Sequence, residues 1–200
     1  MKLLTALPFL AALATAPTMA SASTVVLDFE QNWQYGESID NVYAANGVSF
    51  TNVLGLSNDN DFTYYSGAPS PVGVAMAQLD GVVNTSAFMN VAAGVNGAIS
   101  FYYASPSDVL GAVKAYSGLN GTGELLGTFD LVSNGTGYDV WTPTTFSFTG
   151  VALSFDLTGS ANSVGLDNIS INAVPEPESY ALALLGLGVV AALSRRTKRQ

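Results

Sequence analysis

The stretch Thr24-Val25-Val26-Leu27-Asp28-Phe29-Glu30 has the two-residue period of a β-strand. In that conformation one face carries Val25, Leu27 and Phe29, and the other carries Val26, Asp28 and Glu30. A strand with one wholly apolar face must cover that face with other elements of the chain. The fold therefore depends on what the rest of the sequence offers as a cover.

The rest of the body offers further strands and no helical period of useful length. The expected strands are rich in Val, Phe, Tyr and Thr and are bounded by Gly, Asn, Ser and Pro. They are Val48–Val53, Val74–Leu79, Ala87–Val91, Ala98–Tyr103, Val109–Tyr116, Glu124–Val132, Thr144–Thr149, Val151–Leu157 and Ser163–Asn172. Turn signals stand between many of them, at Asn46-Gly47, Asp80-Gly81, Asn96-Gly97, Asn120-Gly121 and Asn134-Gly135. This spacing predicts an all-β fold, a single β-sandwich of the jelly-roll type.

Composition limits what this body can do. Residues 23–173 are enough for one domain with its own core, and the chain has no Cys, so no disulfide supports it. Between Ser23 and Ser179 the only basic residue is Lys114, against all 15 acidic residues of the chain, which leaves a net charge of −14. Phosphate binding needs clustered Lys and Arg, so nucleic acid is excluded as a partner. Cations and neutral sugars remain as candidates.

The C-terminal end has three parts with different physical properties. Val174-Pro175-Glu176-Pro177 is held extended by its prolines, Tyr180–Leu193 is an uncharged apolar run, and Arg195, Arg196, Lys198 and Arg199 form a basic end. The apolar run predicts a short transmembrane helix, and the basic end predicts that its tail stays in the cytoplasm. A helix of this length spans roughly 21 Å, less than the roughly 30 Å of a bilayer core. A transient anchor fits this shortfall better than a permanent one, although an ordinary C-terminal anchor is the alternative.

These three parts, in this order, resemble the PEP-CTERM sorting signal of Gram-negative bacteria. The resemblance covers residues 174–200 and implies that an exosortase recognises Pro175-Glu176-Pro177 and removes the helix. On this reading the protein is the substrate of the exosortase, and the catalytic groups belong to that partner. The released or attached product would then lie in the cell envelope or the extracellular matrix.

The N-terminal end predicts a secretory signal peptide, residues 1–22. Lys2 supplies the charged region, Leu3–Leu13 supplies the apolar region, and Ala20-Ser21-Ala22 supplies the small residues of a cleavage site. Cleavage is expected after Ala22, with Ala20 as the alternative. The secretion machinery would thus export the chain, and the inner membrane would hold it transiently with its N-terminus outside.

The body itself resembles galactose-binding-like and carbohydrate-binding jelly-roll modules. The resemblance rests on the opening strand Val26–Glu30, on the closing strand Val164–Ile171, and on a hairpin from Val113 to Phe129 around Gly118–Gly123. It implies that the first and last strands lie side by side and that their acidic residues hold a structural Ca²⁺. Asp28, Glu30 and Asp167 are the expected ligands, because Ca²⁺ prefers carboxylate and carbonyl oxygens. The alternative is that Asp28 and Glu30 point to solvent while Asp167 caps a turn.

Aromatic residues near loops are the candidates for glycan contact, because aromatic rings stack on the apolar faces of sugars. We single out Trp33, Tyr64 and Tyr65. Enzymatic function is not expected: without His or Cys the chain has no catalytic triad, thiol nucleophile or zinc site of the usual kind. A carboxylate pair for glycoside hydrolysis is the remaining catalytic option, and no spacing singles one out.

The sequence therefore predicts an exported protein sorted by an exosortase, with a structural or adhesive role associated with exopolysaccharide or biofilm. The first alternative is a carbohydrate-binding module with a structural Ca²⁺. The second is a divergent hydrolase that uses two carboxylates.

Overall fold

The computed structural model describes residues 23–34, 36–57, 65, 67–174 and 186. The described residues form nine strands, which make up one antiparallel sheet. The strands are β1 (Ser23–Leu27), β2 (Val48–Thr51), β3 (Val53–Ser57), β4 (Gly73–Ala77), β5 (Phe88–Ala104), β6 (Val109–Tyr116), β7 (Leu125–Leu131), β8 (Thr142–Asp156) and β9 (Gly165–Ala173). Short 3-10 helices lie at Ala44–Asn46, Leu119–Gly121 and Thr158–Ser160.

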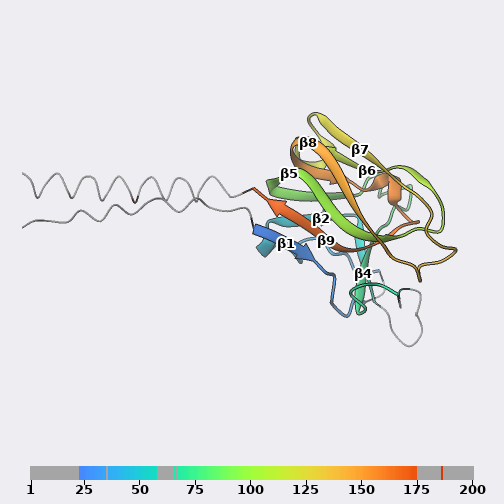
Figure 1. Ribbon diagram of the computed structural model, residues 1–200. Coiled ribbons are helices and arrows are strands. Elements are labelled where there is room, and N and C mark those ends of the chain that lie inside the picture. Colours follow the sequence, from blue (N-terminus) through green and yellow to red (C-terminus); the bar gives the residue numbers. More distant parts are fainter. Residues whose placement is uncertain (1–22, 35, 58–64, 66, 175–185, 187–200) are drawn as a thin grey trace, which may run out of the picture. The chain divides into compact units, whose positions relative to one another are not determined.

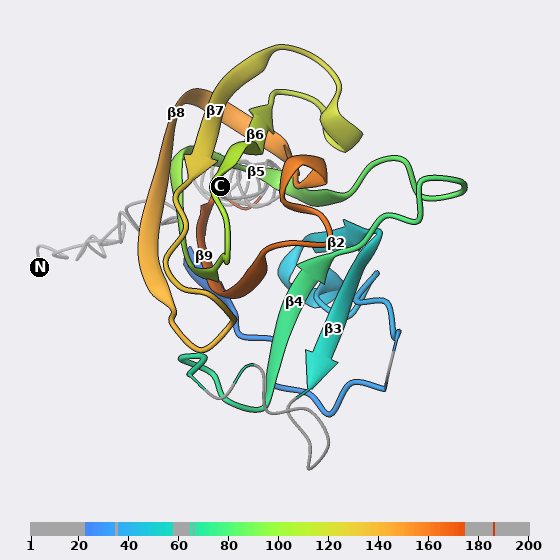
Figure 2. The same ribbon diagram turned by 90° about the vertical axis from the view of Figure 1, so that its right-hand side faces the viewer.

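The order of strands across the sheet is β3-β4-β9-β5-β8-β6-β7, with β1 added to β9 and β2 added to β5. Figure 1 shows β1 and β9 next to each other, and Figure 2 shows β3 and β4 side by side at one side of the sheet. The predicted hairpin from Val113 to Phe129 is present as the β6–β7 pair.

The sheet curls because its two longest strands, β5 and β8, change partners along their length. β5 and β8 pair with each other near both of their ends, but the other edge of β5 pairs first with β2 and then with β9. The other edge of β8 pairs with β6 only through its last residues. The β6–β7 pair therefore folds over β8, and Phe129 of β7 stacks on Phe146 of β8 with ring centroids 5.3 Å apart. This face-to-face arrangement confirms the predicted all-β, β-sandwich class.

Glycines allow these long strands to bend. The sequence predicted breaks at Asn96-Gly97 and at Gly150, but the chain continues as β5 and as β8 through both places. Gly94, Gly97 and Gly150 have φ angles of 81°, 76° and 95°, in the left-handed region, and the β5–β8 register shifts on both sides of Asn96. Bulges of this kind increase the local twist of a sheet without ending the strand.

The third strand was not predicted. Asn52, with φ of 54°, separates β2 from β3, and the sequence pattern showed only the first of these strands. Gly55 in the middle of β3 hides the strand signal. It is needed there because a Cβ atom at this position would overlap the ring of Trp33.

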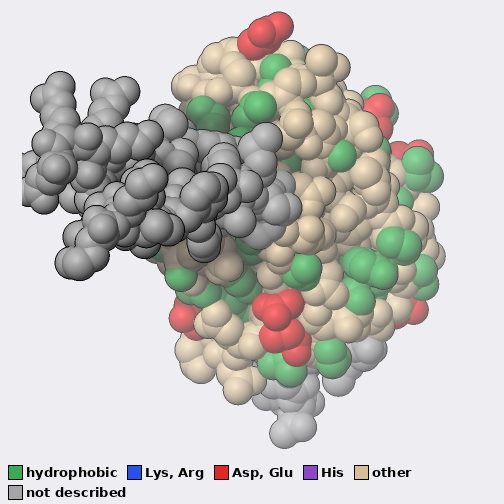
Figure 3. All heavy atoms as spheres, turned by 60° about the vertical axis from the view of Figure 1, so that its left-hand side comes forward, with side chains coloured by type: hydrophobic (Ala, Val, Ile, Leu, Met, Phe, Trp, Pro, Cys, Tyr) green, Lys and Arg blue, Asp and Glu red, His purple; other side chains and the backbone are tan. Residues whose placement is uncertain are grey.

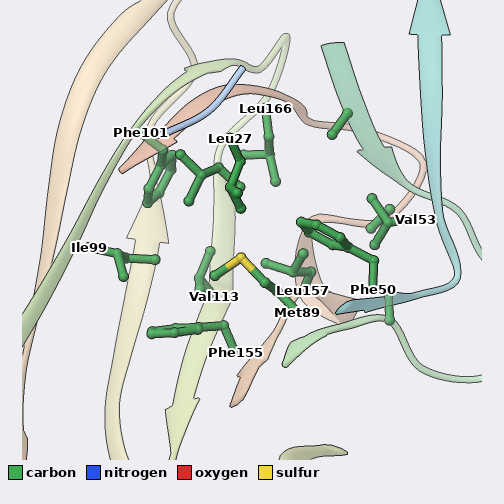
Figure 4. Packing of buried hydrophobic residues seen from close by; sticks show 14 of the residues in the cluster. Leu27, Phe50, Val53, Met89, Ile99, Phe101, Val113, Phe155, Leu157 and Leu166 are labelled. Carbon is green, nitrogen blue, oxygen red and sulfur yellow. The ribbon is translucent and has the colours of Figure 1, made fainter. Parts of the chain in front are cut away.

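The core lies between the two halves of the curled sheet (Figure 4). One in-register row shows how it is built: Val25 of β1, Ile171 of β9, Ile99 of β5 and Phe146 of β8 are successive partners across the sheet. Ile171, Ile99 and Phe146 are buried, and Val25 packs against them. Further along β8, Phe155 is fully buried beside Phe148, with ring centroids 5.6 Å apart.

We expect Phe155→Ala to lower the free energy of unfolding by about 3–5 kcal/mol, because the change leaves a cavity in a packed core. Val151→Ala in the same strand is the control, since Val151 is 43% exposed and its truncation should cost less than about 0.5 kcal/mol. Urea denaturation of the two variants measures both values. Equal effects of the two substitutions would contradict the core described here.

Candidate functional site

The first and last strands lie side by side, as the resemblance to jelly-roll modules implied. β1 pairs with β9 along its whole length, from Ser23 opposite Ala173 to Leu27 opposite Ile169. The carboxylates at positions 28, 30 and 167 are brought into one region by this pairing.

Asp167 is the buried member of this group. A bulge in β9 directly follows it: Asn168 has φ of 47°, and the β5–β9 register shifts between Ser100 and Tyr102. The carboxylate is 0% exposed and lies beneath the segment that contains Ser70. Its Oδ2 accepts the Ser70 N–H at 2.8 Å and its Oδ1 accepts the Asn168 N–H at 2.7 Å. The hydroxyl of Ser70 also donates to Oδ1 of Asn168 at 2.9 Å. Asp167 thus fastens the Ser70 segment to the closing strand.

Glu30 and Asp28 are exposed and make different contacts. Oε1 of Glu30 accepts the N–H groups of Val72 at 2.8 Å and Gly73 at 3.1 Å. Asp28 accepts a long hydrogen bond, 3.4 Å, from the hydroxyl of Tyr43. Each of the two acids therefore contacts a segment that is distant in the sequence, rather than pointing freely to solvent.

Electrostatics in this region disfavours negative charge. Burial raises the pKa of Asp167 to about 7; the N–H groups of Ser70 and Asn168 lower it, and the charges of Glu30 and Asp28 raise it further. Burial also raises the pKa of Tyr43 to about 12, although the N–H of Phe29 lowers it. The region thus holds more negative charge than its surroundings stabilise.

A bound cation would relieve this excess charge, so the electrostatics fits the predicted Ca²⁺. The geometry of the described residues gives less support, because no group of three or more of their acidic side chains is arranged to hold one metal ion. The carboxylate oxygens of Asp167 and Glu30 already accept backbone N–H groups, which leaves fewer of their lone pairs for a metal ion. The calcium site with Asp28, Glu30 and Asp167 stays a prediction.

Trp33 lies in the core rather than at the surface. Its side chain is 6% exposed, and its indole N–H donates to the carbonyl of Phe29 at 2.9 Å. The ring packs over Gly55 and Gly73, where a Cβ atom would approach it too closely. No ring face is therefore open to a sugar, and the placement of Trp33 does not favour the predicted glycan contact.

The predicted tyrosine pair falls only partly within the described residues. Tyr65 is half-buried, and its ring lies 5.9 Å from that of Tyr138. Tyr64 lies outside the described residues. The glycan contact predicted for these two tyrosines stays a prediction.

A groove of about 680 Å³ lies on the outer face of the sheet, across β1, β9, β5 and β8. No motif in the sequence predicts this groove. It is lined by Val26, Ser100, Phe101, Tyr102, Pro143, Thr144, Thr145, Asn168 and Ser170. The residue opposite Tyr102 in β9 is Asp167, so the groove and the carboxylates are neighbours. Alternation of Ser and Thr with buried residues in these strands was the one signal in the sequence that pointed to this face.

A second groove, of about 500 Å³, lies where β2 meets β5. Two of its polar residues, Asn90 and Asn120, are bonded to each other: the Asn90 side chain donates to Oδ1 of Asn120, and the Asn120 N–H donates to Oδ1 of Asn90, both at 2.8 Å. These groups already have partners within the protein. The first groove therefore offers more unused polar groups.

The last described residue of the body is Val174, whose N–H donates to the carbonyl of Gly94 at 2.9 Å. Residues 173–199 match the PEP-CTERM protein-sorting motif. The chain carries a PEP-CTERM sorting signal. This motif implies a protein that is exported and sorted to the cell envelope by an exosortase. The resemblance predicted from Val174, Pro175, Glu176 and Pro177 and from the basic end is thereby confirmed at the level of the motif.

Several predictions concern residues that the structure does not describe. These are the signal peptide with Ala20 and Ala22, Pro175 to Pro177, the basic residues Arg195, Arg196, Lys198 and Arg199 and, except for Gly186, the helix Tyr180–Leu193. Within the described residues, no helix has the length and hydropathy needed to cross a bilayer.

The body of the chain is similar to several solved structures. A family 35 carbohydrate-binding module from Paenibacillus barcinonensis is 19% identical, with a TM-score of 0.39, and the match covers 64% of this chain and 93% of the module. The K1 cleaved adhesin domain of Lys-gingipain from Porphyromonas gingivalis is 14% identical, with a TM-score of 0.44 and coverages of 76% and 98%. The C-terminal family 6 module of a marine laminarinase from Zobellia galactanivorans is 14% identical, with a TM-score of 0.40 and coverages of 75% and 99%.

No curated protein matches the chain at a significant level.

The raised pKa of Asp167 predicts how stability depends on pH. The folded-state value, about 7, lies above the ordinary value of 3.8, so the folded protein holds this proton more tightly than the unfolded chain. Stability from this group is therefore full below about pH 4 and is lost as the pH rises toward 7. We expect the Tm to fall from pH 5 to pH 8, and we expect Asp167→Asn to reduce that fall. Thermal unfolding at the two pH values measures the change in Tm, and Asp139→Asn, at an exposed position, is the control. An Asp167→Asn variant with the pH dependence of the wild type would contradict this account.

Proposed function

We propose that the mature protein is an exported protein of the cell envelope or extracellular matrix, with a structural or adhesive role beside exopolysaccharide. The observation that carries the proposal is the sorting motif at residues 173–199. In this proposal the general secretion route exports the chain, the C-terminal helix holds it briefly in the inner membrane, and an exosortase then removes that helix.

The end of the folded body is compatible with removal of the tail. β9 ends at Ala173, and Val174 is still bonded to Gly94, directly before Pro175 of the motif. Processing at or after Pro175-Glu176-Pro177 would therefore leave the sheet intact. The body is strongly acidic, with Lys114 as its only basic residue, and a high net charge of this kind keeps an exported protein soluble. On the face shown in Figure 3, acidic side chains are scattered and no basic side chain is visible among the described residues.

A carbohydrate-binding module with a structural Ca²⁺ is the second candidate function. The uncharged groove across β1, β9, β5 and β8 favours it, because sugar hydroxyls pair with hydroxyl and amide groups of the kind found there. In this reading Asp28, Glu30 and Asp167 would hold the ion beside the groove.

Catalysis has weaker support. A glycosidase needs an acid with a raised pKa and a second carboxylate, both in contact with the substrate. Asp167 has the raised pKa, but its carboxylate is 0% exposed beneath the Ser70 segment and cannot reach a substrate. We therefore propose a binding role rather than an enzymatic one.

Intact mass of the protein recovered from cells tests the sorting proposal. We expect the wild type to lack the segment after the Pro-Glu-Pro region, and we expect the double variant Pro175→Ala/Pro177→Ala to keep it and stay in the membrane fraction. Pro106→Ala, an exposed proline of the body, is the control and should be processed like the wild type. Retention of Arg199 in the wild type would make the tail an ordinary anchor and defeat the proposal.

Calcium binding is tested separately, by thermal unfolding of the full chain in CaCl₂ and in EDTA. If the ion binds only the folded state, a concentration of 100 times Kd adds about 2.7 kcal/mol of stability. We expect Asp167→Asn to lose this gain and Asp139→Asn to keep it, because Asp139 lies outside the group. Identical unfolding in CaCl₂ and EDTA would remove the calcium site from the second candidate function.

A further inference from the structure

The groove on the outer face is built from one register of four strands. Val26 of β1 is paired with Ser170 of β9, Ser170 with Ser100 of β5, and Ser100 with Thr145 of β8. Side chains in register on one face of a sheet stand next to each other. At the usual spacing of about 4.8 Å between strands, this row is roughly 14 Å long. Tyr102 and Pro143, which are also paired, run beside it.

The polar groups of this row are unused by the protein. Among the described residues, the hydroxyl groups of Ser100, Ser170, Thr145 and Tyr102 make no hydrogen bond to another protein group. The side chains of Ser100, Ser170 and Tyr102 are half-buried, and that of Thr145 is exposed, so a ligand can reach them. Each hydroxyl can both donate and accept, which is the chemistry that a polyhydroxylated ligand requires.

The groove differs in charge from the rest of the body. Its lining contains no charged residue, whereas residues 23–179 carry a net charge of −14. The carboxylate of Asp167 lies opposite Tyr102 in the register, at the groove's border. A polyanion would therefore be repelled by the surrounding charge and would find no basic partner in the groove.

We propose that the row Val26–Ser170–Ser100–Thr145, with Tyr102, is a binding site for a neutral polysaccharide lying across the strands. Tyr102 supplies one aromatic ring beside the row, and the hydroxyls supply hydrogen bonds to the sugar hydroxyls. Polymers that carry carboxylate or sulfate groups are excluded by charge. This inference deepens the proposed function and rests on it, because it states which class of matrix polymer the exported protein would contact.

Affinity electrophoresis of the full chain tests the inference, in native gels that contain dextran, laminarin or galactomannan as neutral probes, or alginate as an anionic probe. We expect retardation of the wild type by at least one neutral polymer and none by alginate. Thr145→Arg puts a long side chain in the groove and should weaken the binding by about tenfold or more, the equivalent of roughly 1.4 kcal/mol. Thr149→Arg, at an exposed position of the same strand outside the groove, is the matched control and should bind like the wild type.

Tyr102→Ala is the second variant, because it removes the aromatic ring without adding volume to the groove. If Thr145→Arg unfolds at a lower temperature than Thr149→Arg, the binding of Tyr102→Ala decides the result. Retardation of both groove variants equal to that of the wild type would overturn the proposal, as would a wild type that binds alginate or binds none of the neutral polymers. Processing of the tail is measured independently by intact mass. A processed protein without neutral-polymer binding would therefore refute the groove while the sorting proposal stands.

Discussion

The register between β1, β9, β5 and β8 is the constraint on which both faces of this protein depend. It aligns Val25, Ile171, Ile99 and Phe146 on the inner face, where they form part of the core. Because side chains alternate between the two faces of a strand, the same register aligns their sequence neighbours on the outer face. A slip by one residue would bury the hydroxyls and expose the core, so the apolar row keeps the polar row in line. The groove is in this sense a by-product of the packing that holds the sandwich together.

The bulge at Asn168 is the point where this regular pattern ends. Beyond it, Asp167 stands opposite Tyr102 and is covered by the Ser70 segment, whose backbone N–H it binds. A carboxylate in that position costs stability in its charged form, as its raised pKa indicates. In return it ties a long connection to the closing strand. Titratable groups with strongly shifted pKa values are common at functional sites of proteins.

The sequence was most informative where local signals and tertiary structure agree. β6 has the predicted bounds Val109–Tyr116, because a strand pattern there is followed by a turn signal at Asn120-Gly121. Glycines misled the prediction at Gly97 and Gly150, since a single glycine indicates a turn or a bulge equally well, and only the pairing partner decides between them. For the candidate site, the adjacency of the first and last strands was anticipated from a resemblance. The burial of Trp33 and the groove were not, because both depend on contacts between distant strands.

The position of β9, through which the chain leaves the sheet, has a mechanical consequence. β9 lies between β1 and β5 and is the last strand, and Val174 is bonded to Gly94 directly after it. A pulling force applied at the C-terminal end therefore enters the domain along an internal strand, parallel to its axis. Such a force loads the hydrogen bonds of β9 to β1 and to β5 together, in shear, rather than breaking them one after another from one end. A domain tethered by this end would resist detachment forces better than one tethered through an edge strand.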